Sequence, residues 1–334
     1  MLSENGAVRK QCSLVADALL HGRVVPFLGA GVNLCDRPEG APGWKTPGEE
    51  VGLPSGRELA EYLADKYEYP AKQNCTECGR EGFQRDLDLA RVSQYGVMQL
   101  DEGPLKEELR RIFKPQYKPT TVHRFLAELP LPKPDKPQDQ YPLIVTTNYD
   151  DLIEQALGND NLDLVFYNPA DDPPRFWHKE PGKAATRIDG DANQYPFDFF
   201  KERPVVLKIH GTIDRASQDL DGFVITEDDY IQYLAEEPLE NFLPSAILCK
   251  MRQMHHLLFL GYGLRDWNLR VFLRRLNRAP DSRYRAWAVY QTEDDTERQF
   301  WGTKGIQILN VDLTVFLDEL RKQLLFRLAP LAAA

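Results

Sequence analysis

The chain has 334 residues, 42% hydrophobic and 28% charged, which is ordinary globular composition and enough for one large α/β domain or two smaller ones. Its net charge of −10 argues against direct nucleic-acid binding across a broad basic surface. No run of about 18 apolar residues and no secretory signal is visible, so we expect a cytoplasmic protein without a membrane segment.

Short apolar runs that could form buried strands alternate with segments of helical periodicity. Strands are predicted over 24–28, 143–147, 162–167, 205–209, 257–260, 286–290 and 305–309. Helices are predicted over 9–22, 87–97, 104–113, 122–129, 151–157, 242–255, 266–277 and 313–326, and from near Gly56, Thr226 and Thr292, with Ser55 and Thr226 as N-caps. This alternation predicts an α/β fold with a Rossmann-like doubly wound, mostly parallel sheet.

Two long segments interrupt this alternation. Residues 56–129 predict a helical insertion or subdomain after the first strand. Residues 168–203 are rich in Pro, Asp and Gly and lack clear periodicity, which indicates an irregular insertion or a lid. We therefore expect one domain over residues 9–326 that carries both insertions.

The five cysteines are an odd number scattered over a large chain, which indicates reduced thiols. Cys75 and Cys78 form half of a zinc-ribbon pattern, but no second Cys-x-x-Cys follows and a structural zinc site needs four ligands. We expect two free thiols here rather than a metal site.

Three segments far apart in the chain follow predicted strands and carry polar or glycine residues. They are Phe27-Leu-Gly-Ala-Gly-Val-Asn33, Thr146-Thr-Asn-Tyr-Asp150 and Lys208-Ile-His-Gly211. Ligands of open parallel sheets bind at the carboxyl ends of strands, so we expect the three segments to form one dinucleotide site.

The glycines of Gly29-Ala30-Gly31 would allow backbone N–H groups to approach a diphosphate. A tight turn after the strand explains them equally well. Leu34 occupies the position of the third glycine of the Rossmann fingerprint, which argues against a standard dehydrogenase.

Asn148 could hold a water molecule or a hydroxyl group, and Asp150 could accept from an amide or a ribose hydroxyl. Alternatively both residues cap the following helix, although Asp151 could do so alone. His210 is a candidate general base because the pKa of histidine lies near neutrality, whereas a lone histidine is more often structural.

Gly261-Tyr262-Gly263 forms a second glycine loop after a predicted strand, and Asp266 follows it. This loop could bind the second half of a dinucleotide. Alternatively, Asp266 is only the N-cap of the next helix.

Together these segments resemble the sirtuin family, in particular the sirtuin-like domains of bacterial phage-defence systems. Sirtuins carry Gly-Ala-Gly-x-Ser, Thr-Gln-Asn-x-Asp and His-Gly in this order, and the segment 259–268 is similar to a later nucleotide loop of the defence branch. The resemblance spans roughly residues 20–315. It implies that Asn148 and His210 are catalytic. The cofactor-binding candidates are Gly29, Ala30, Gly31, Asn33, Thr147, Asp150, Gly261, Tyr262, Gly263 and Asp266.

The chain also departs from the protein deacylases of that family. Leu34-Cys-Asp-Arg-Pro-Glu39 replaces their Gly-Ile-Pro-Asp-Phe-Arg, and residues 212–248 contain none of their four zinc cysteines. We therefore expect no zinc, and attack by water on NAD+ rather than by an acyl-lysine. The resemblance then implies an NAD+ glycohydrolase that releases nicotinamide and ADP-ribose as the toxic effector of abortive infection.

Two other functions remain open, an NAD+-dependent deacylase and a non-catalytic sensor of NAD+ or ADP-ribose. The resemblance also implies control by homo-oligomerisation, by a partner ATPase or Argonaute-like subunit, or by a nucleotide signal.

Overall fold

The structure is a computed structural model that describes most of the chain. The described residues are 2–48, 51–70, 87–129, 141–189, 192–235, 243–253, 256–263, 285–291 and 295–332. Three predictions lie outside them: the role of Asp266, the helix over 266–277 and the state of Cys75 and Cys78.

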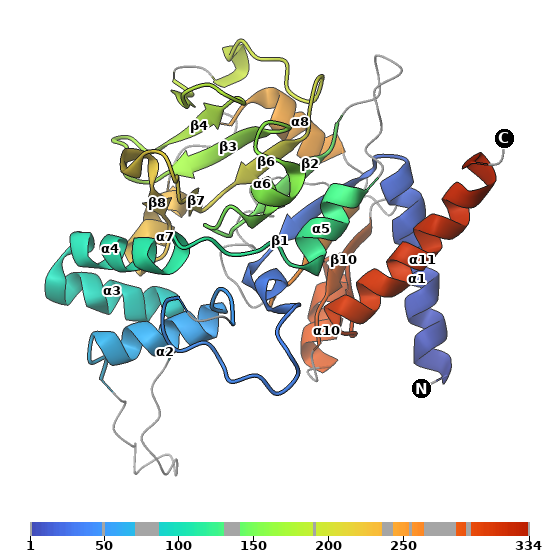
Figure 1. Cartoon of the computed structure of the whole chain (residues 1–334), viewed down its shortest axis with the longest axis horizontal. Coiled ribbons are helices and arrows are strands. Elements are labelled where there is room, and N and C mark those ends of the chain that lie inside the picture. The colour runs from blue at the N-terminus through green and yellow to red at the C-terminus, as the bar shows by residue number, and fades with distance from the viewer. Residues whose placement is uncertain are drawn as a thin grey trace.

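A nine-stranded sheet forms the centre of the molecule, in the order β11-β10-β9-β1-β2-β6-β3-β4-β5 (Figure 1). All strands from β11 to β3 are parallel, whereas β4 and β5 continue the sheet in antiparallel pairing. The predicted doubly wound, mostly parallel α/β fold is therefore confirmed.

The strands of the large sheet are short. They are β1 (Val24–Leu28), β2 (Leu143–Thr146), β3 (Asp163–Asn168), β4 (Arg175–Lys179), β5 (Thr186–Arg187), β6 (Val205–Lys208), β9 (His256–Leu260), β10 (Arg285–Val289) and β11 (Ile306–Leu309). A separate pair consists of β7 (Gly211–Thr212) and β8 (Gly222–Phe223).

The helices occur between the strands at most of the predicted places. They are α1 (Leu2–Leu20), α2 (Gly56–Lys66), α3 (Leu89–Leu100), α4 (Glu102–Phe113), α5 (Thr121–Glu128), α6 (Leu152–Leu157), α7 (Glu227–Ala235), α8 (Ser245–Gln253), α10 (Asp295–Thr303) and α11 (Leu313–Ala332). None of the helices in the described ranges is long and apolar enough to cross a membrane.

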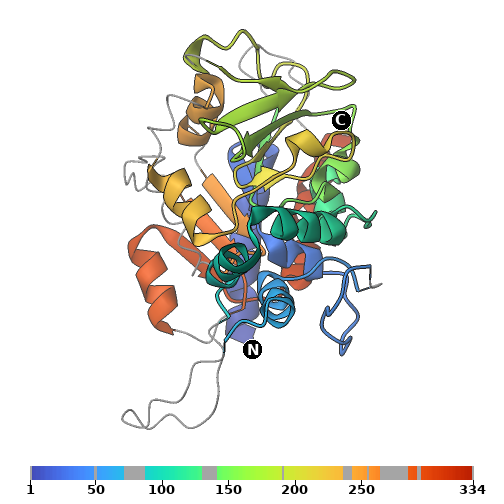
Figure 2. The same cartoon turned by 90° about the vertical axis from the view of Figure 1, so that its left-hand side faces the viewer.

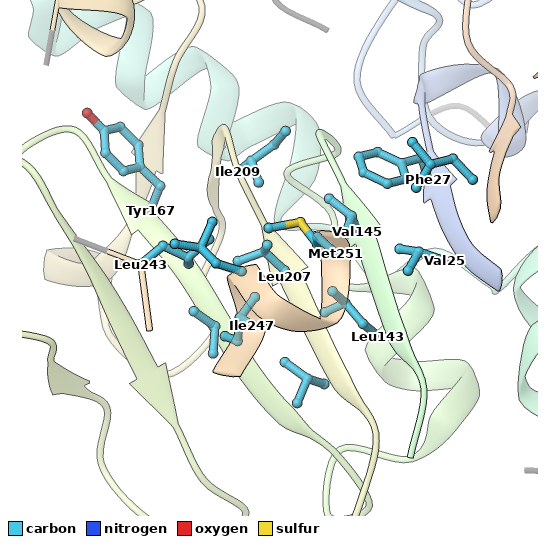
Figure 3. Close-up of a cluster of buried hydrophobic side chains, with 14 of the residues drawn as sticks. Val25, Phe27, Leu143, Val145, Tyr167, Leu207, Ile209, Leu243, Ile247 and Met251 are labelled. Atoms are coloured by element: carbon cyan, nitrogen blue, oxygen red, sulfur yellow. The ribbon is translucent and has the colours of Figure 1, made fainter. Parts of the chain in front are cut away.

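Helices cover both faces of the sheet because successive residues of a strand point to opposite sides. Figure 2 shows α5, α6 and α11 on one side, and α7, α8 and α10 on the other. Helix α1 contributes to the same buried cluster as α5, α6 and α11. On the α8 face, Ile247 and Met251 pack over Leu143 and Leu207 in one buried cluster (Figure 3). This three-layer core fixes the strand ends from which the candidate site is built.

Helices α2, α3 and α4 lie beside the sheet and enclose a core cluster of their own. Tyr149, which follows β2, also belongs to this cluster and packs edge-on between Phe113 and Phe223. By contrast, α5 contributes Val122 and Phe125 to the core beneath the sheet. Only part of the segment 56–129 therefore packs as a separate helical layer, and its boundary as a subdomain stays a prediction.

Local sequence signals account for several helix ends. Ser55 caps α2 in a reciprocal capping box with Glu58, as predicted. Thr226 forms the same arrangement with Asp229 at the start of α7. Helix α1 ends before the predicted residue because Gly22 has a φ of 62° and closes a Schellman motif.

The segment 168–203 is more regular than expected. Strand β4 pairs antiparallel with β3 along its whole length, and β5 pairs with β4. Phe176 and His178 are buried, whereas Arg175, Trp177 and Lys179 are partly exposed. Strand β4 therefore does alternate, over a stretch too short for periodicity alone to reveal.

Candidate functional site

Four neighbouring strands end at the same level and present the candidate residues side by side. Leu28 of β1 aligns with Leu260 of β9 and with Thr146 of β2, and Thr146 aligns with Lys208 of β6. The residues two positions beyond this row are Ala30, Tyr262, Asn148 and His210. The sheet register therefore brings the three predicted segments and the Gly261 loop to one edge, as expected for parallel strands.

The glycines of the first and last segments allow two backbone loops to cross. Gly29 and Gly31 donate their amides to the carbonyls of Leu260 and Gly261, at 3.0 Å each. A Cβ on Gly31 would lie 2.7 Å from the Gly261 oxygen, and one on Gly261, whose φ is 68°, would lie 2.3 Å from the Val32 nitrogen.

The Gly29 and Gly31 amides were expected to donate to a diphosphate, but they donate to backbone carbonyls. The Gly29 and Gly31 N–H groups bond to the neighbouring loop and do not point toward open space for a diphosphate. Their lack of a side chain serves loop packing, and contact of this turn with NAD+ stays a prediction. The turn itself continues as a short 3-10 helix, η1 (Ala30–Leu34).

Asn33 and Asp150 meet inside the site although they are distant in sequence. The Asn33 Nδ2 atom donates to the Asp150 Oδ2 atom at 2.9 Å, and both side chains are buried. Asp150 also accepts the Leu152 amide through Oδ1 at 3.1 Å, so it caps α6 as well. The Asn33 Oδ1 atom is buried and has no hydrogen-bond partner among the described residues, which leaves one acceptor for a ligand.

Asn148 lies directly over the first loop. Its side-chain Nδ2 atom donates to the Gly29 carbonyl at 3.3 Å, and its backbone N–H donates to the Thr146 hydroxyl at 3.0 Å. The same hydroxyl donates to the Leu28 carbonyl. Asn148 does not cap α6, so its side chain is held toward the β1 loop instead.

His210 is buried at the end of β6, and its ring packs edge-on against Tyr230 and Tyr233. Its carbonyl accepts the Val224 amide at 2.9 Å. Gly211 follows with a φ of 100°, a conformation that favours glycine and directs the chain into β7. The His-Gly pair is thus a strand end that turns sharply at a buried imidazole.

The second glycine loop is joined to the β2 segment by side chains. The Tyr262 hydroxyl donates to the Thr147 hydroxyl at 2.9 Å, and Tyr262 is buried. Gly263 is exposed and is the last described residue of this loop. The structure therefore brings together every predicted site residue except Asp266, which lies outside the described ranges.

Residue patterns alone did not identify two buried groups near the site, Lys208 and His123. The sequence segment Lys208-Ile-His-Gly211 predicted no role for its lysine, yet this side chain is fully buried and bonds to the Asn148–Asp150 turn and to Glu154. The informative signal was a lysine within an otherwise apolar strand, since lysine is buried only when it is paired.

His123 on α5 is buried and shares a capping box with Thr120. The Thr120 hydroxyl also lies 2.9 Å from the Val32 carbonyl, next to Asn33. Burial lowers the pKa of His123 to about 4, against the opposing charges of Asp150 and Asp36. A neutral imidazole therefore supports the loop that carries Asn33.

Within the described ranges, no three histidine, cysteine or acidic side chains are grouped so as to hold a metal ion. Two open cavities lie away from the site residues. One of about 580 Å³ is lined by Arg110, Arg111 and Lys114 of the α4 end, and another of about 460 Å³ by Tyr141, Arg203 and Pro204, where β2 and β6 begin.

The fold and this edge define an α/β protein with a site at the carboxyl ends of parallel strands, the arrangement used by nucleotide-binding enzymes. A family model for the SIR2-like domain matches residues 142–309, half of the chain. The chain belongs to the SIR2-like domain family.

Three relatives extend this assignment. Defense-associated sirtuin 2 of Bacillus subtilis is 24% identical over 173 residues, which cover 50% of this chain and 14% of the relative. The NAD(+) hydrolase ThsA of Cytobacillus dafuensis is 26% identical over 197 residues, and that of Bacillus cereus (strain MSX-D12) is 27% identical over 198 residues. The last two alignments cover 58% of this chain and 31% and 33% of the relatives, so the chain spans a third of their length at most.

Proposed function

We propose that this chain hydrolyses NAD+ to nicotinamide and ADP-ribose and acts as the toxic effector of a bacterial anti-phage system. Membership in the SIR2-like family supports NAD+ as the ligand. The names of the three relatives, a defence-associated sirtuin and two NAD+ hydrolases, support the reaction and its setting.

The observation that carries the proposal is the alignment of four strand ends. It places Asn148 and His210 at equivalent positions of the adjacent strands β2 and β6, two residues beyond the paired Thr146 and Lys208. Beside them, the buried Asn33 Oδ1 atom is an acceptor that a ribose hydroxyl could satisfy.

The chemistry requires little acid–base assistance at the leaving group. Nicotinamide is cationic in NAD+ and leaves as a neutral molecule, so cleavage proceeds through an oxocarbenium-like state at the ribose, as in glycoside hydrolysis. Asn148 would position the attacking water and the ribose. His210 would act through the ribose hydroxyls or accept the proton of the water.

We assign the binding role to the remaining residues at this edge. The first loop would orient the phosphates and ribose, Asp150 would accept from the nicotinamide amide, and the second loop would hold the other nucleotide half. The proposed binding residues are Gly29, Ala30, Gly31, Asn33, Thr147, Asp150, Gly261, Tyr262, Gly263 and Asp266.

Replacing either proposed catalytic residue tests the function. We expect Asn148→Ala and His210→Ala each to lower nicotinamide release from NAD+ by roughly a hundredfold or more while the chain stays folded, because each removes a group that acts in the transition state. Asn161→Ala and His21→Ala change exposed residues of the same types and serve as matched controls. Full activity in both site variants would refute the proposal.

The same assay separates the other two functions. Nicotinamide release that depends on an added acylated peptide would indicate a deacylase, and NAD+ binding by calorimetry without turnover would indicate a sensor. The absence of cysteine in residues 212–248 disfavours deacylation, because the zinc module of the deacylases has no ligands there.

An NAD+ hydrolase must be silent in the uninfected host, since depletion of NAD+ is lethal. We propose that this chain acts in the cytoplasm as a homo-oligomer, and that a partner ATPase or Argonaute-like subunit or a nucleotide signal activates it. Its acidic net charge argues against activation by direct nucleic-acid binding.

A further inference from the structure

Lys208 is a fully buried lysine at the end of β6. A charged ammonium group is costly to bury and remains only where it is paired and hydrogen-bonded. Along β6, Val206 and Lys208 point to the α6 side of the sheet, whereas Leu207 points to the opposite face.

The Lys208 ammonium group donates to three oxygens, the number that it can satisfy. One is the Glu154 Oε1 atom at 2.8 Å, on α6. The other two are the carbonyls of Tyr149 and Asp150, at 3.1 and 2.5 Å. The bond to Glu154 pairs the charge, but the two carbonyls belong to the turn that carries Asn148.

A second set of contacts holds the same turn. The Tyr149 hydroxyl donates to the Val224 carbonyl at 2.7 Å, and the Val224 amide donates to the His210 carbonyl at 2.9 Å. The β2 turn and the β6 end are thus joined both through Lys208 and through the backbone of residue 224.

We infer that Lys208 is a positioning residue, whose ammonium group fixes the backbone of the Asn148–Asp150 turn and thereby aims both side chains at the ligand. The catalytic part of this inference rests on the proposed NAD+ hydrolysis. The structural part does not, because it concerns only the geometry of the turn. No role in proton transfer follows, since Lys208 is buried among carbonyl and carboxylate oxygens.

The test compares Lys208→Met with the double variant Lys208→Met/Glu154→Gln and with Glu154→Gln alone. Burial raises the pKa of Glu154, and a Gln side chain at this position keeps an oxygen that can accept from Lys208. The double variant leaves no buried charge unpaired and is expected to fold even if the single lysine variant does not. Glu154→Gln retains both bonds from Lys208 to the turn.

Hydrogen exchange gives a readout that needs no ligand. The amides of Asn148 and Leu152 bond to the side chains of Thr146 and Asp150, so they report the shape of the turn. We expect faster exchange at residues 147–152 in both variants that lack Lys208, and wild-type exchange there in Glu154→Gln. Leu207→Ala, at the buried position next to Lys208 on the opposite face, is the control for general destabilisation.

Steady-state kinetics give the second readout. We expect kcat of folded Lys208→Met/Glu154→Gln to fall roughly a hundredfold, a typical result of misplaced catalytic groups, with a smaller change in KM. Unchanged exchange in the turn, or equal changes in Leu207→Ala and the Lys208 variants, would overturn the inference. A wild-type chain that hydrolyses no NAD+ even with its activating partner or nucleotide present would instead refute the proposed function, and the exchange result would still decide the role of Lys208.

Discussion

At the scale of single residues, the site depends on buried polar groups that support one another. Asn33 bonds to Asp150, and Asp150 in turn caps α6. His123 lies behind the first loop as a neutral imidazole bonded to Thr120. Burial lowers the pKa of His123 to about 4, below its ordinary value of 6.5. As the pH falls, the unfolded chain therefore binds a proton at His123 at a higher pH than the folded chain does.

This difference predicts acid sensitivity. Because the pKa of His123 is lower in the folded chain, its neutral form stabilises the fold fully above pH about 6.5, and this stabilisation is lost as the pH falls toward about 4. At pH 5 the loss amounts to about 2 kcal/mol of unfolding free energy. Urea unfolding at pH 7.5 and at pH 5 measures this difference in unfolding free energy. We expect His123→Gln, which keeps a side chain able to accept in the capping box, to reduce that difference by the same amount. Identical pH dependence in both proteins would contradict the assignment.

At the scale of elements, one carboxylate joins the loop after the first site segment to the helical layer. Glu58 on α2 accepts from Arg37 at 2.6 Å, from the Trp44 amide at 2.7 Å and from the Ser55 amide at 2.7 Å. Burial alone would raise the pKa of Glu58, but these hydrogen bonds lower it to about 2. Glu58 on α2 therefore holds the described parts of this loop, residues 37–48 and 51–53, through Arg37 and the Trp44 amide.

We expect Glu58→Ala to lower the free energy of unfolding by roughly 1–3 kcal/mol, because it removes the capping box and leaves loop donors unpaired. Hydrogen exchange should increase at residues 37–48 and 51–53 in particular. Glu61→Ala is the matched control, since Glu61 lies one turn further on the same helix and makes only an exposed pair with Arg57. Equal effects of the two substitutions would show that Glu58 is not the link between loop and helix.

At the scale of the whole molecule, three layers hold the strand ends in place without any metal cluster in the described ranges. We expect the purified protein to contain substoichiometric zinc by elemental analysis and to keep its melting temperature and NAD+ hydrolysis in the presence of 1,10-phenanthroline. The reason is that Cys75 and Cys78 form half of a zinc-ribbon pattern and no second Cys-x-x-Cys follows them in the sequence. Stoichiometric zinc, or unfolding by the chelator, would contradict this expectation.

Much of the fold was predictable because its signals are local. Apolar runs located the strands β1, β2, β6 and β9 to within a residue or two, and Ser55 and Thr226 marked helix starts through capping boxes within three residues of sequence. The strands β4 and β5 were missed because they are short and lie within a segment rich in Pro, Asp and Gly. Periodicity over so few residues carries little information.

The sequence by itself determined the order of strands and helices, the polar residues that follow each strand and the resemblance to sirtuins. Only the tertiary structure decided how those residues meet. Asn33 and Asp150 are 117 positions apart, and Lys208 reaches Glu154 from 54 positions away. The crossing of Gly31 with Gly261 likewise depends on β1 and β9 being neighbours. Such contacts depend on strand order and register, which arise from burial of the whole sheet and leave no local pattern.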